Sequence, residues 1–388
     1  MNTILEKIKQ ELTSKGDYKA LIRNLASPIY IADKDVFKTN LKELLAAFKK
    51  EYNNVNVGYS FKTNYCETFI GVVKRLDCFA EVASPMEFNM ALESGFSPSK
   101  IIYNGVIPHP SKMWLMKKGG LYIIENIDDL HEVIKGISDG SVENNGICLR
   151  LCVDLKNGVE SRFGFLVGSE EYNHMSMLVK EKQLKVKAIH CHISYGRSIE
   201  QWKMRALQMV EQAKIFNAEI IDLGGNMFGR VDAKISEQIK REIGEIPSYA
   251  DYAKVVGNVF KKAFPQENKL LLLECGTPIV GNAMWLLAKV IGLKTINGKP
   301  LAVLNCTNFD IGFVCRNKDA AIYPIGEGGS YYNGMPIYGC TCMEKDVINR
   351  AYYGKLAKGA LVLIANVGAY GMNVSNEFMT HKPCCLTI

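Results

Sequence analysis

The chain has 388 residues, of which 48% are hydrophobic and 22% are charged. Single hydrophobic cores stop growing at roughly 250–300 residues, so this length predicts one large domain and a second, smaller one. The 47 basic and 40 acidic residues give a formal net charge of +7 and are scattered along the chain. A charge this diffuse argues against a nucleic-acid-binding protein, although it mildly favours an anionic ligand.

The first residues of the chain predict an amphipathic helix. Leu5, Ile8 and Leu12 recur at helical spacing, and Glu6 and Glu11 are unlike the basic start of a secretory signal. No apolar run approaches the ~18 residues that a membrane-spanning helix needs, so we expect no membrane association. The cysteines lie mostly in apolar stretches. Close pairs of cysteines occur, but none is followed by a second pair of Cys or His at the spacing of a zinc site. We therefore expect a reduced, cytoplasmic protein without a metal.

Eight short apolar stretches alternate with helical patterns from residue 55 to residue 276. The apolar stretches predict strands at 55–62, 78–84, 100–106, 121–126, 146–154, 186–194, 218–225 and 269–276. The helical patterns include 85–95, 127–137, 169–183, 199–216 and 248–264. Near-continuous apolar strands that alternate with helices are typical of parallel sheets buried on both faces. Eight such units predict an α/β fold with a (β/α)8 TIM-like barrel, and a doubly wound open sheet is the alternative.

The sequence after the barrel has a different pattern. From residue 283 to the end, short β-rich runs are broken by Gly, Pro and Asn turns, which predicts a C-terminal β domain. We expect the barrel to span residues 27–282 and the β domain to combine residues 1–26 with 283–388.

Polar residues stand at the carboxyl ends of the predicted strands, where the active sites of such barrels lie. They are Lys62, Glu81, Ser84, Asn104, Glu125, His192, Gly224, Gly225, Asn226 and Glu274. A lysine in a partly desolvated pocket can form a Schiff base with an aldehyde, and a Gly-Gly turn offers backbone N–H groups to a phosphate. A carboxylate aimed at a pyridine nitrogen keeps that nitrogen protonated. Together these features indicate a site for pyridoxal 5′-phosphate.

Each of these residues alone also has an ordinary structural explanation. A strand-end lysine is usually solvated, a lone histidine is more often a hydrogen-bonded core residue, and a strand-end glutamate often forms a salt bridge. The functional interpretation depends on their occurrence at strand after strand.

Eight segments also resemble, in their order, the fold-type III pyridoxal phosphate-dependent decarboxylases, the family that contains ornithine and diaminopimelate decarboxylases. The segments are YSFKTN, FAEVAS, SRFGF, IHCHIS, IIDLGGN, LLECGTP, GCTCMEKD and NVGAYGMN, and the resemblance extends from about residue 26 to the end. It implies pyridoxal 5′-phosphate as the cofactor and removal of an α-carboxylate as the reaction. It also implies a homodimer with composite active sites, in which the β domains pair two chains.

The resemblance implies roles for the strand-end residues. Lys62 matches the lysine that carries the cofactor, His192 matches the histidine stacked on its ring, and Glu274 matches the carboxylate on its nitrogen. Glu81 takes the place of an acidic residue near the ring. Cys342 resembles the cysteine that the partner subunit supplies as a proton donor, so the expected catalytic residues are Lys62, Cys342, His192 and Glu274.

The resemblance also implies how the phosphate is held. Gly224, Gly225 and Asn226 match the phosphate-binding turn, and Tyr370 matches a tyrosine that hydrogen-bonds the phosphate. After His192 this chain has Ile-Ser-Tyr, where relatives usually have a small residue followed by Gly and Ser. Ser194 or the adjacent Tyr195 is therefore expected at the cofactor.

Several residues depart from the family pattern around the substrate. Thr277 replaces an arginine, Asn226 replaces a third glycine, and Met343 replaces the acid that binds the far end of the substrate. Cys306 and Asn308 stand where relatives have an Asp-Gly pair. We expect Met343, Asn308 and Thr277 to contact the substrate, and a protonated distal amine would lack a counter-charge there.

The departures at the substrate pocket favour an amino acid group carried on a larger biosynthetic intermediate, linked to a peptide, a nucleotide or a carrier. Diaminopimelate or ornithine/lysine decarboxylation is the alternative. An amino-acid racemase and a non-catalytic regulatory relative are two further alternatives. Glu274 argues against the racemase, because a carboxylate makes the ring a stronger electron sink. The presence of Lys62 and Tyr370 argues against the regulator.

Overall fold

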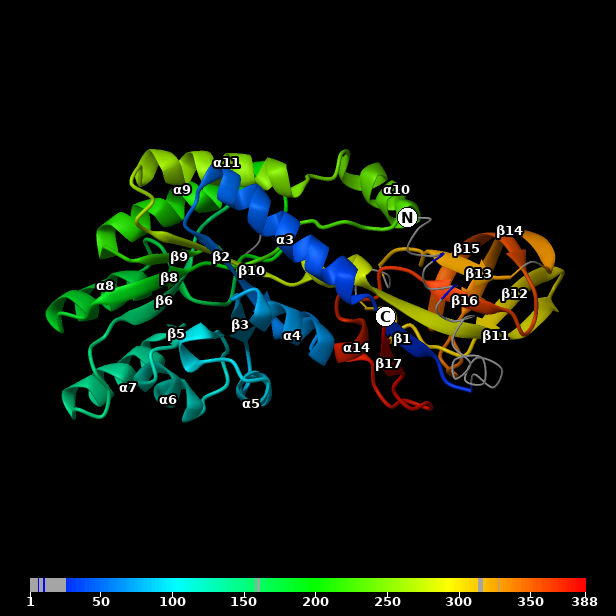
Figure 1. Cartoon of the computed structure of the whole chain (residues 1–388), viewed down its shortest axis with the longest axis horizontal. Helices are drawn as coiled ribbons and strands as arrows, with labels where there is room; N and C mark the ends of the chain where they lie inside the picture. Colours follow the sequence, from blue (N-terminus) through cyan, green and yellow to red (C-terminus); the bar gives the residue numbers. More distant parts are fainter. Residues whose placement is uncertain are drawn as a thin grey trace.

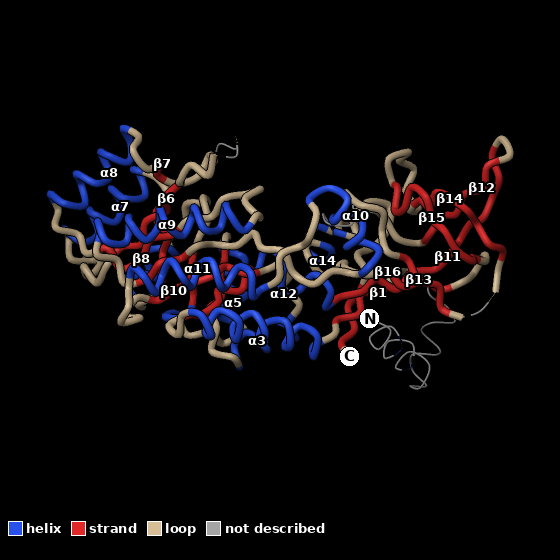
Figure 2. Tube along the Cα trace, turned by 90° about the horizontal axis from the view of Figure 1, so that it is seen from above, coloured by secondary structure: helices blue, strands red, loops and turns tan. Residues whose placement is uncertain are grey.

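The computed structural model describes residues 26–388 apart from 157, 159–160, 313–316 and 327, together with Glu6 and Gln10. A helix-covered barrel and a β-rich part lie next to each other along the long axis of the molecule (Figure 1). The view from above separates the helical end from the strand-rich end (Figure 2). Within the described residues, no helix is both long and apolar enough to cross a membrane. The N-terminal helix expected from the sequence falls almost entirely outside the described residues.

A closed sheet of eight parallel strands forms the barrel, as the sequence predicts. The strands are β2 (Val55–Ser60), β3 (Phe79–Val82), β4 (Ile101–Tyr103), β5 (Leu121–Ile124), β6 (Ile147–Cys152), β8 (Val186–His190), β9 (Ile220–Asp222) and β10 (Leu270–Cys275). β10 pairs with β2, and β5 pairs with β6, so the sheet closes on itself and the open-sheet alternative is wrong. A short strand, β7 (Phe165–Leu166), extends β6 outside the circle.

Helices cover the outside of the barrel. They are α3 (Lys34–Glu51), α4 (Glu67–Arg75), α5 (Pro85–Glu93), α6 (Ser111–Lys117), α7 (Ile127–Ser138), α8 (Glu170–Glu181), α9 (Ile199–Phe216) and α11 (Tyr249–Ala263). Helix α10 (Ala233–Ile243) lies instead beside the β domain, where Gln238 hydrogen-bonds Asp319 (Figure 1). Polar side chains begin several of them where the sequence breaks from strand to helix. Ser84 accepts a hydrogen bond from Glu87 N, and Ser198 forms a capping box with Gln201.

The interior of the barrel has two layers because side chains two residues apart in a strand point to the same side. An apolar layer is formed by Phe79, Ile102, Leu121, Ile123, Cys148, Ala188 and Leu272, with Ile220 packed against it. Two residues further along the same strands, polar side chains take their place: Glu81, Asn104, Glu125, Arg150, His190, Asp222 and Glu274. The apolar layer closes the bottom of the barrel, and the polar layer forms the floor of its mouth.

A second sheet forms the β domain. Its strands are β1 (Ile29–Ala32), β11 (Met284–Ile296), β12 (Lys299–Leu304), β13 (Ile322–Ile325), β14 (Ser330–Tyr338), β15 (Val347–Leu356), β16 (Leu361–Ile364) and β17 (Cys384–Thr387). β1 pairs antiparallel with β11 and parallel with β17. The expected boundary at residue 27 is therefore wrong for this segment: β1 belongs to the β domain, because its backbone hydrogen bonds are made with strands about 250 residues or more away.

The C-terminal segment ties the two parts together at the loop that follows β2. This loop contains the short 3-10 turn η1 (Phe61–Thr63). Tyr370 N donates to Thr63 O at 2.8 Å, and Asn373 Nδ2 donates to the carbonyl oxygens of Phe61 and Lys62 at 3.0 and 3.1 Å. Asn64 Nδ2 donates in return to Gly368 O at 2.8 Å. The backbone on both sides of Lys62 is thus held by residues of the β domain.

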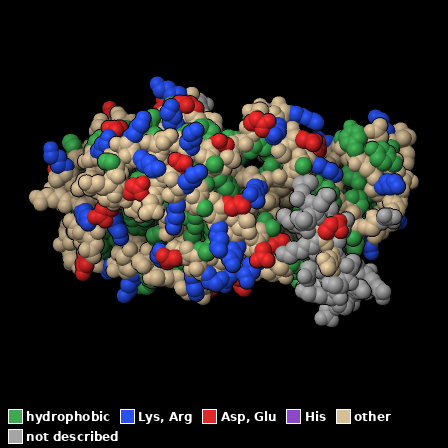
Figure 3. Space-filling view, turned by 45° about the horizontal axis from the view of Figure 1, so that its top comes forward, with side chains coloured by type: hydrophobic (Ala, Val, Ile, Leu, Met, Phe, Trp, Pro, Cys, Tyr) green, Lys and Arg blue, Asp and Glu red, His purple; other side chains and the backbone are tan. Residues whose placement is uncertain are grey.

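Charged side chains are interspersed on the surface. On the face shown in Figure 3, Lys and Arg alternate with Asp and Glu over the barrel, as the scattered charges of the sequence predict. The eleven cysteines that lie among the described residues are all free thiols.

Candidate active site

The floor of the barrel mouth brings together the polar ends of the strands. In the register of the sheet, Glu81 lies beside Ser60, Glu274 lies beside Gly58, and His190 lies beside Asp222. A Cβ atom at Gly58 would lie 2.9 Å from the Ile102 side chain and within 4 Å of both Glu81 and Glu274. A glycine at this position leaves room for the two carboxylates to approach each other.

Lys62 extends from η1 over these carboxylates. Its amine donates hydrogen bonds to both oxygens of Glu81, which is fully buried. Burial lowers the pKa of the Lys62 amine, but the charges of Glu81 and Glu274 outweigh this effect, and the pKa lies above its usual value. The Lys62 side chain is still 38% exposed, so the amine is accessible from the mouth.

Glu274 lies at the centre of a buried hydrogen-bonded cluster. His190 Nε2 lies 3.1 Å from Glu274 Oε2, and Asn104 Nδ2 lies 3.4 Å from each oxygen of Glu274. Burial raises the pKa of Glu274, and burial followed by the charge of Glu274 raises the pKa of Asp222 well above its usual value. Asp222 and Glu274 therefore both keep a proton more readily than exposed carboxyl groups, and the effect is larger for Asp222.

Arg150 balances this cluster from β6. It donates to Asn104 Oδ1 at 3.0 Å, lies 3.6 Å from Glu125, and stacks 4.5 Å from the centre of the Phe163 ring. His190 is fully buried, and burial together with Arg150 holds its pKa well below the usual value, so its ring is neutral. His190, Asp222 and Glu274 place potential metal-ligand atoms within 4.8 Å of one another, but this group already faces the cations Lys62 and Arg150.

His192 is held at the other side of the mouth by the glycine turn. Gly225 N donates to His192 Nδ1 at 3.1 Å, which leaves this nitrogen unprotonated and fixes the ring. Burial, followed by the charge of Lys62, lowers the pKa of His192 well below its usual value. A neutral, fixed imidazole can lie flat against an aromatic ligand.

The turn itself accepts no side chains. A Cβ atom at Gly225 would lie 2.2 Å from Glu274 O, and one at Gly224 would lie 2.7 Å from Cys191 O. Gly224 also has a φ of +62°, which disfavours other residues. The turn therefore packs directly against the neighbouring strand ends, and its N–H groups are used inside the protein: Gly224 N donates to Asp222 Oδ1 at 2.8 Å and Gly225 N donates to His192.

These features fit pyridoxal 5′-phosphate. Lys62 offers an amine for the aldehyde, Glu274 offers a buried carboxylate for the ring nitrogen, and His192 offers a flat face. The turn at Gly224 and Gly225, which the family resemblance assigns to the phosphate, lies directly beside His192.

Other predicted residues lie at the edge of the mouth or outside it. Ser194 is exposed, and Tyr195 is 80% exposed. Asn226 hydrogen-bonds Ile193 O through its side chain at 3.1 Å. Thr277 begins the short helix α12 (Thr277–Val280) and lines a small cavity beside the glycine turn. Tyr370 is bonded to the Lys62 loop through its backbone.

Cys342, Met343 and Asn308 lie in the β domain, and their described hydrogen bonds stay there. Cys342 is exposed and its N–H contacts Met379 Sδ at 3.4 Å, while Asn308 Nδ2 donates to Lys345 O at 2.9 Å. Among the described residues, no hydrogen bond or ion pair joins any of the three to Lys62, Glu81 or Glu274.

Four residues of the cluster are not among the site residues predicted from the sequence. The sequence does not identify Arg150 and Asp222, leaves His190 open between a structural and a functional role, and predicts Asn104 only as a strand end. All four stand two residues after an apolar residue of the barrel's inner layer, and this spacing is the signal that could have found them.

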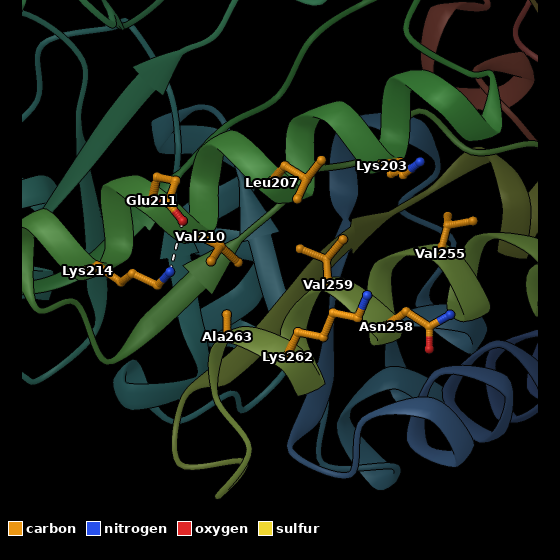
Figure 4. Close-up of a pocket in the computed structure, with 10 residues that line it drawn as sticks. All are labelled: Lys203, Leu207, Val210, Glu211, Lys214, Val255, Asn258, Val259, Lys262 and Ala263. Carbon is orange, nitrogen blue, oxygen red and sulfur yellow. Dashed lines mark hydrogen bonds and ion pairs between the residues drawn. The ribbon is translucent and has the colours of Figure 1, made fainter.

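A groove on the outer surface of the barrel is separate from this site. Figure 4 shows it between α9 and α11, with Leu207, Val210 and Val259 at its base and Lys203 and Lys262 at its rim. None of the residues of the barrel mouth lines it.

Comparisons with known proteins agree with this geometry. A family model described as "Pyridoxal-dependent decarboxylase, pyridoxal binding domain" matches residues 38–281. The diaminopimelate decarboxylase of Staphylococcus aureus (strain COL) is 27% identical over 405 residues, which cover 95% of this chain and 90% of that protein.

Solved structures share the fold at lower identity. The diaminopimelate decarboxylase of Helicobacter pylori complexed with L-lysine has a TM-score of 0.79 at 20% identity, over 96% of this chain and 94% of that chain. The Paramecium bursaria Chlorella virus arginine decarboxylase bound to agmatine has a TM-score of 0.79 at 18% identity, over 100% of both chains. Because the family model spans more than half of the chain and contains Lys62, His192 and Glu274, the chain belongs to the pyridoxal-dependent decarboxylases, enzymes that use pyridoxal phosphate to decarboxylate amino acids.

Proposed function

We propose that this enzyme decarboxylates a free amino acid that carries a second charged group at its far end, with diaminopimelate as the first substrate to test. The observation that carries the decarboxylase chemistry is the amine of Lys62 bonded to buried Glu81 beside buried Glu274. The choice of substrate is supported by the relatives, several of which are diaminopimelate decarboxylases.

The residues of the mouth have separate tasks in this proposal. Bound pyridoxal phosphate supplies a ring that accepts the electron pair released as the carboxylate leaves. Lys62 binds the cofactor's aldehyde, and Glu81 accepts the proton that this amine must lose. Glu274 holds a proton at the ring nitrogen, and Asp222 keeps the charge on Glu274 by remaining protonated. His192, fixed by Gly225, supports the ring and excludes water from one face.

The proton that replaces the carboxylate requires a donor above the substrate. Lys62 is available from the same chain, and Cys342 is the donor that the family resemblance implies. Cys342 is exposed and, among the described residues, has no hydrogen bond to Lys62, Glu81 or Glu274, which fits a role in the site of a second copy of the chain. We therefore propose a homodimer with composite active sites, in which Cys342 protonates the product.

The conjugated substrate favoured from the sequence receives no support from the relatives, and we replace it by the free amino acid. Met343 offers no acid to the distal amine of a free diamino acid. Glu344 follows directly and is exposed on the same turn. Buried Asp346 fixes this turn by accepting hydrogen bonds from Thr341 N at 3.0 Å and Asn308 N at 2.7 Å. Glu344 can therefore provide the carboxylate one residue later.

Carbon dioxide release tests the proposal. It should be measured with meso- and LL-diaminopimelate, lysine, ornithine, arginine and a peptide-linked diaminopimelate. The free diamino acids should give the highest kcat/KM, and Glu344→Gln should lower that value by about fivefold, the size of an exposed ion pair. Lys345→Gln is the matched control and should leave it unchanged. A higher kcat/KM for the peptide-linked substrate would overturn the proposed substrate class.

A further inference from the structure

The family resemblance implies an arginine at the position of Thr277 and a third glycine at the position of Asn226. The phosphate end of this chain therefore lacks the cation that the resemblance implies. The phosphate group of the cofactor carries a charge of about −1.5 to −2 at neutral pH and binds best to charged hydrogen-bond donors. Another cation, Arg197, lies beside the glycine turn.

Arg197 lies in the loop between β8 and α9, close to the glycine turn. Its Nε donates to Asn226 Oδ1 at 2.6 Å, and its guanidinium lies 5.2 Å from the centre of the Phe228 ring. Tyr252 OH donates to Arg197 O at 2.6 Å and holds the backbone. The side chain is half-buried and lines the same small cavity as Thr277. The guanidinium is therefore held in place at the cavity that Thr277 also lines.

The terminal nitrogens of Arg197 remain available. Among the described residues, the only hydrogen bond of its guanidinium is the one from Nε to Asn226. An arginine has five N–H donors, so the two terminal nitrogens can bind two oxygens of one phosphate. Its bond to Asn226, which directly follows Gly225, places the guanidinium beside the glycine turn, where the phosphate is expected.

We propose that Arg197 is the phosphate-binding cation of this enzyme, in place of the arginine that relatives have at the position of Thr277. Asn226 is its positioning residue. Asn226 has a φ of +77°, a left-handed conformation that glycine adopts freely and asparagine tolerates better than most residues. Asparagine keeps the turn that a third glycine would form and adds a side chain that holds Arg197. The asparagine at position 226 thus compensates, through Arg197, for the uncharged residue at position 277. This inference concerns the cofactor and rests on the proposed use of the site, but it is independent of which amino acid is the substrate.

Binding measurements on the purified full-length protein test this inference without relying on turnover. The cofactor-free protein is titrated with pyridoxal 5′-phosphate and, separately, with pyridoxal, which has the same ring and aldehyde but no phosphate. Arg197→Met should weaken binding of pyridoxal 5′-phosphate by about 10- to 100-fold, as expected for lost charged hydrogen bonds. The affinity for pyridoxal should change by less than about threefold, because Lys62 and Glu274 still bind the ring.

Three further variants separate a phosphate contact from a structural effect. Arg230→Met is the matched control, because Arg230 lines the same cavity but is exposed and paired with Glu43 at 2.7 Å. It should bind both ligands as the unmodified protein does. Asn226→Gly should weaken binding of the phosphorylated ligand less than Arg197→Met does. Thr277→Arg added to Arg197→Met should restore that binding by placing a cation at the position used by relatives.

Two results would overturn the inference. One is unchanged affinity of Arg197→Met for pyridoxal 5′-phosphate, and the other is an equal loss of affinity for both ligands. Failure of the substrate proposal gives a different result: tight, Arg197-dependent binding of pyridoxal 5′-phosphate without carbon dioxide release from any free amino acid.

Discussion

Replacing Lys62 by methionine should make the stability of the cofactor-free protein depend strongly on pH. Methionine has a similar length but no charge, so Glu81 is left fully buried without its cation. An unpaired buried carboxylate either stays ionised, at a cost of about 3–5 kcal/mol, or takes up a proton. The protonated state sets the upper limit of the penalty, because the protein adopts whichever state costs less.

The limit follows from the pKa of the group in the unfolded chain. An unfolded glutamate titrates near about 4.3, and each pH unit above that value adds about 1.36 kcal/mol to the cost of keeping the proton. At pH 7 the penalty is therefore at most about 3.7 kcal/mol, and at pH 5 it falls to about 1 kcal/mol. In the Lys62→Met variant the folded state raises the pKa of Glu81, so the folded state binds more protons than the unfolded state. The unfolding free energy of the variant therefore falls as the pH rises above the unfolded pKa.

Urea unfolding followed by circular dichroism at pH 5, 6, 7 and 8 measures this effect. The difference in unfolding free energy between the unmodified protein and Lys62→Met should increase with pH. Lys62→Met combined with Glu81→Gln is the control, since removal of both charges should recover most of the stability and the pH dependence of the unmodified protein. A difference that is equal at pH 5 and pH 7, or a double variant no more stable than Lys62→Met, would refute the assignment of Glu81 as the buried partner of Lys62.

Further substitutions test the other parts of the site. Glu274→Gln should lower the decarboxylation rate by at least about 100-fold, equivalent to about 2.7 kcal/mol. An unchanged rate would show that decarboxylation needs no negative charge at this position, and would revive the racemase alternative. Gly225→Ala should weaken cofactor binding in a spectroscopic titration, because its Cβ would lie 2.2 Å from Glu274 O, and unaltered binding would contradict a tight turn. Co-expressed Lys62→Ala and Cys342→Ala chains should regain about a quarter of the normal activity, because half of the dimers formed at random keep one intact composite site. No recovery above the separate variants would exclude shared sites.

The barrel could be predicted because its signals are local. Each strand is a short apolar run, and helices such as α7 and α9 have both an apolar face and a polar residue at their start. The pairing of β1 is not local: Ile29 is bonded in register with Leu287 and Cys384, and nothing in the segment itself distinguishes these partners from barrel strands. The domain boundary failed for that reason.

Site residues can be predicted from the sequence where a charged residue ends an apolar strand. They cannot be predicted where a polar residue lies inside an apolar strand and its role depends on its neighbours in the fold. Lys62, Glu81 and Glu274 stand out because charged residues interrupt apolar runs, and the structure places them together. Arg150 sits inside a strand that otherwise reads as core, so its charge could be interpreted only once Asn104 and Glu125 were known to be beside it. Arg197 lies in a loop, where basic residues are common, and only its bond to Asn226 distinguishes it from solvated neighbours.

The hydrogen bonds between the C-terminal segment and the Lys62 loop limit how this protein can be divided into fragments. A fragment that ends near residue 282 would contain every polar residue of the mouth and the whole segment matched by the family model. It would lack Asn373 and Tyr370, whose hydrogen bonds fix the backbone at Phe61, Lys62 and Thr63. It would also lack β11 and β17, both partners of β1. The barrel is therefore not a separable catalytic domain, because residues outside it align the amine of Lys62. Domain exchanges should keep the last twenty residues together with the barrel.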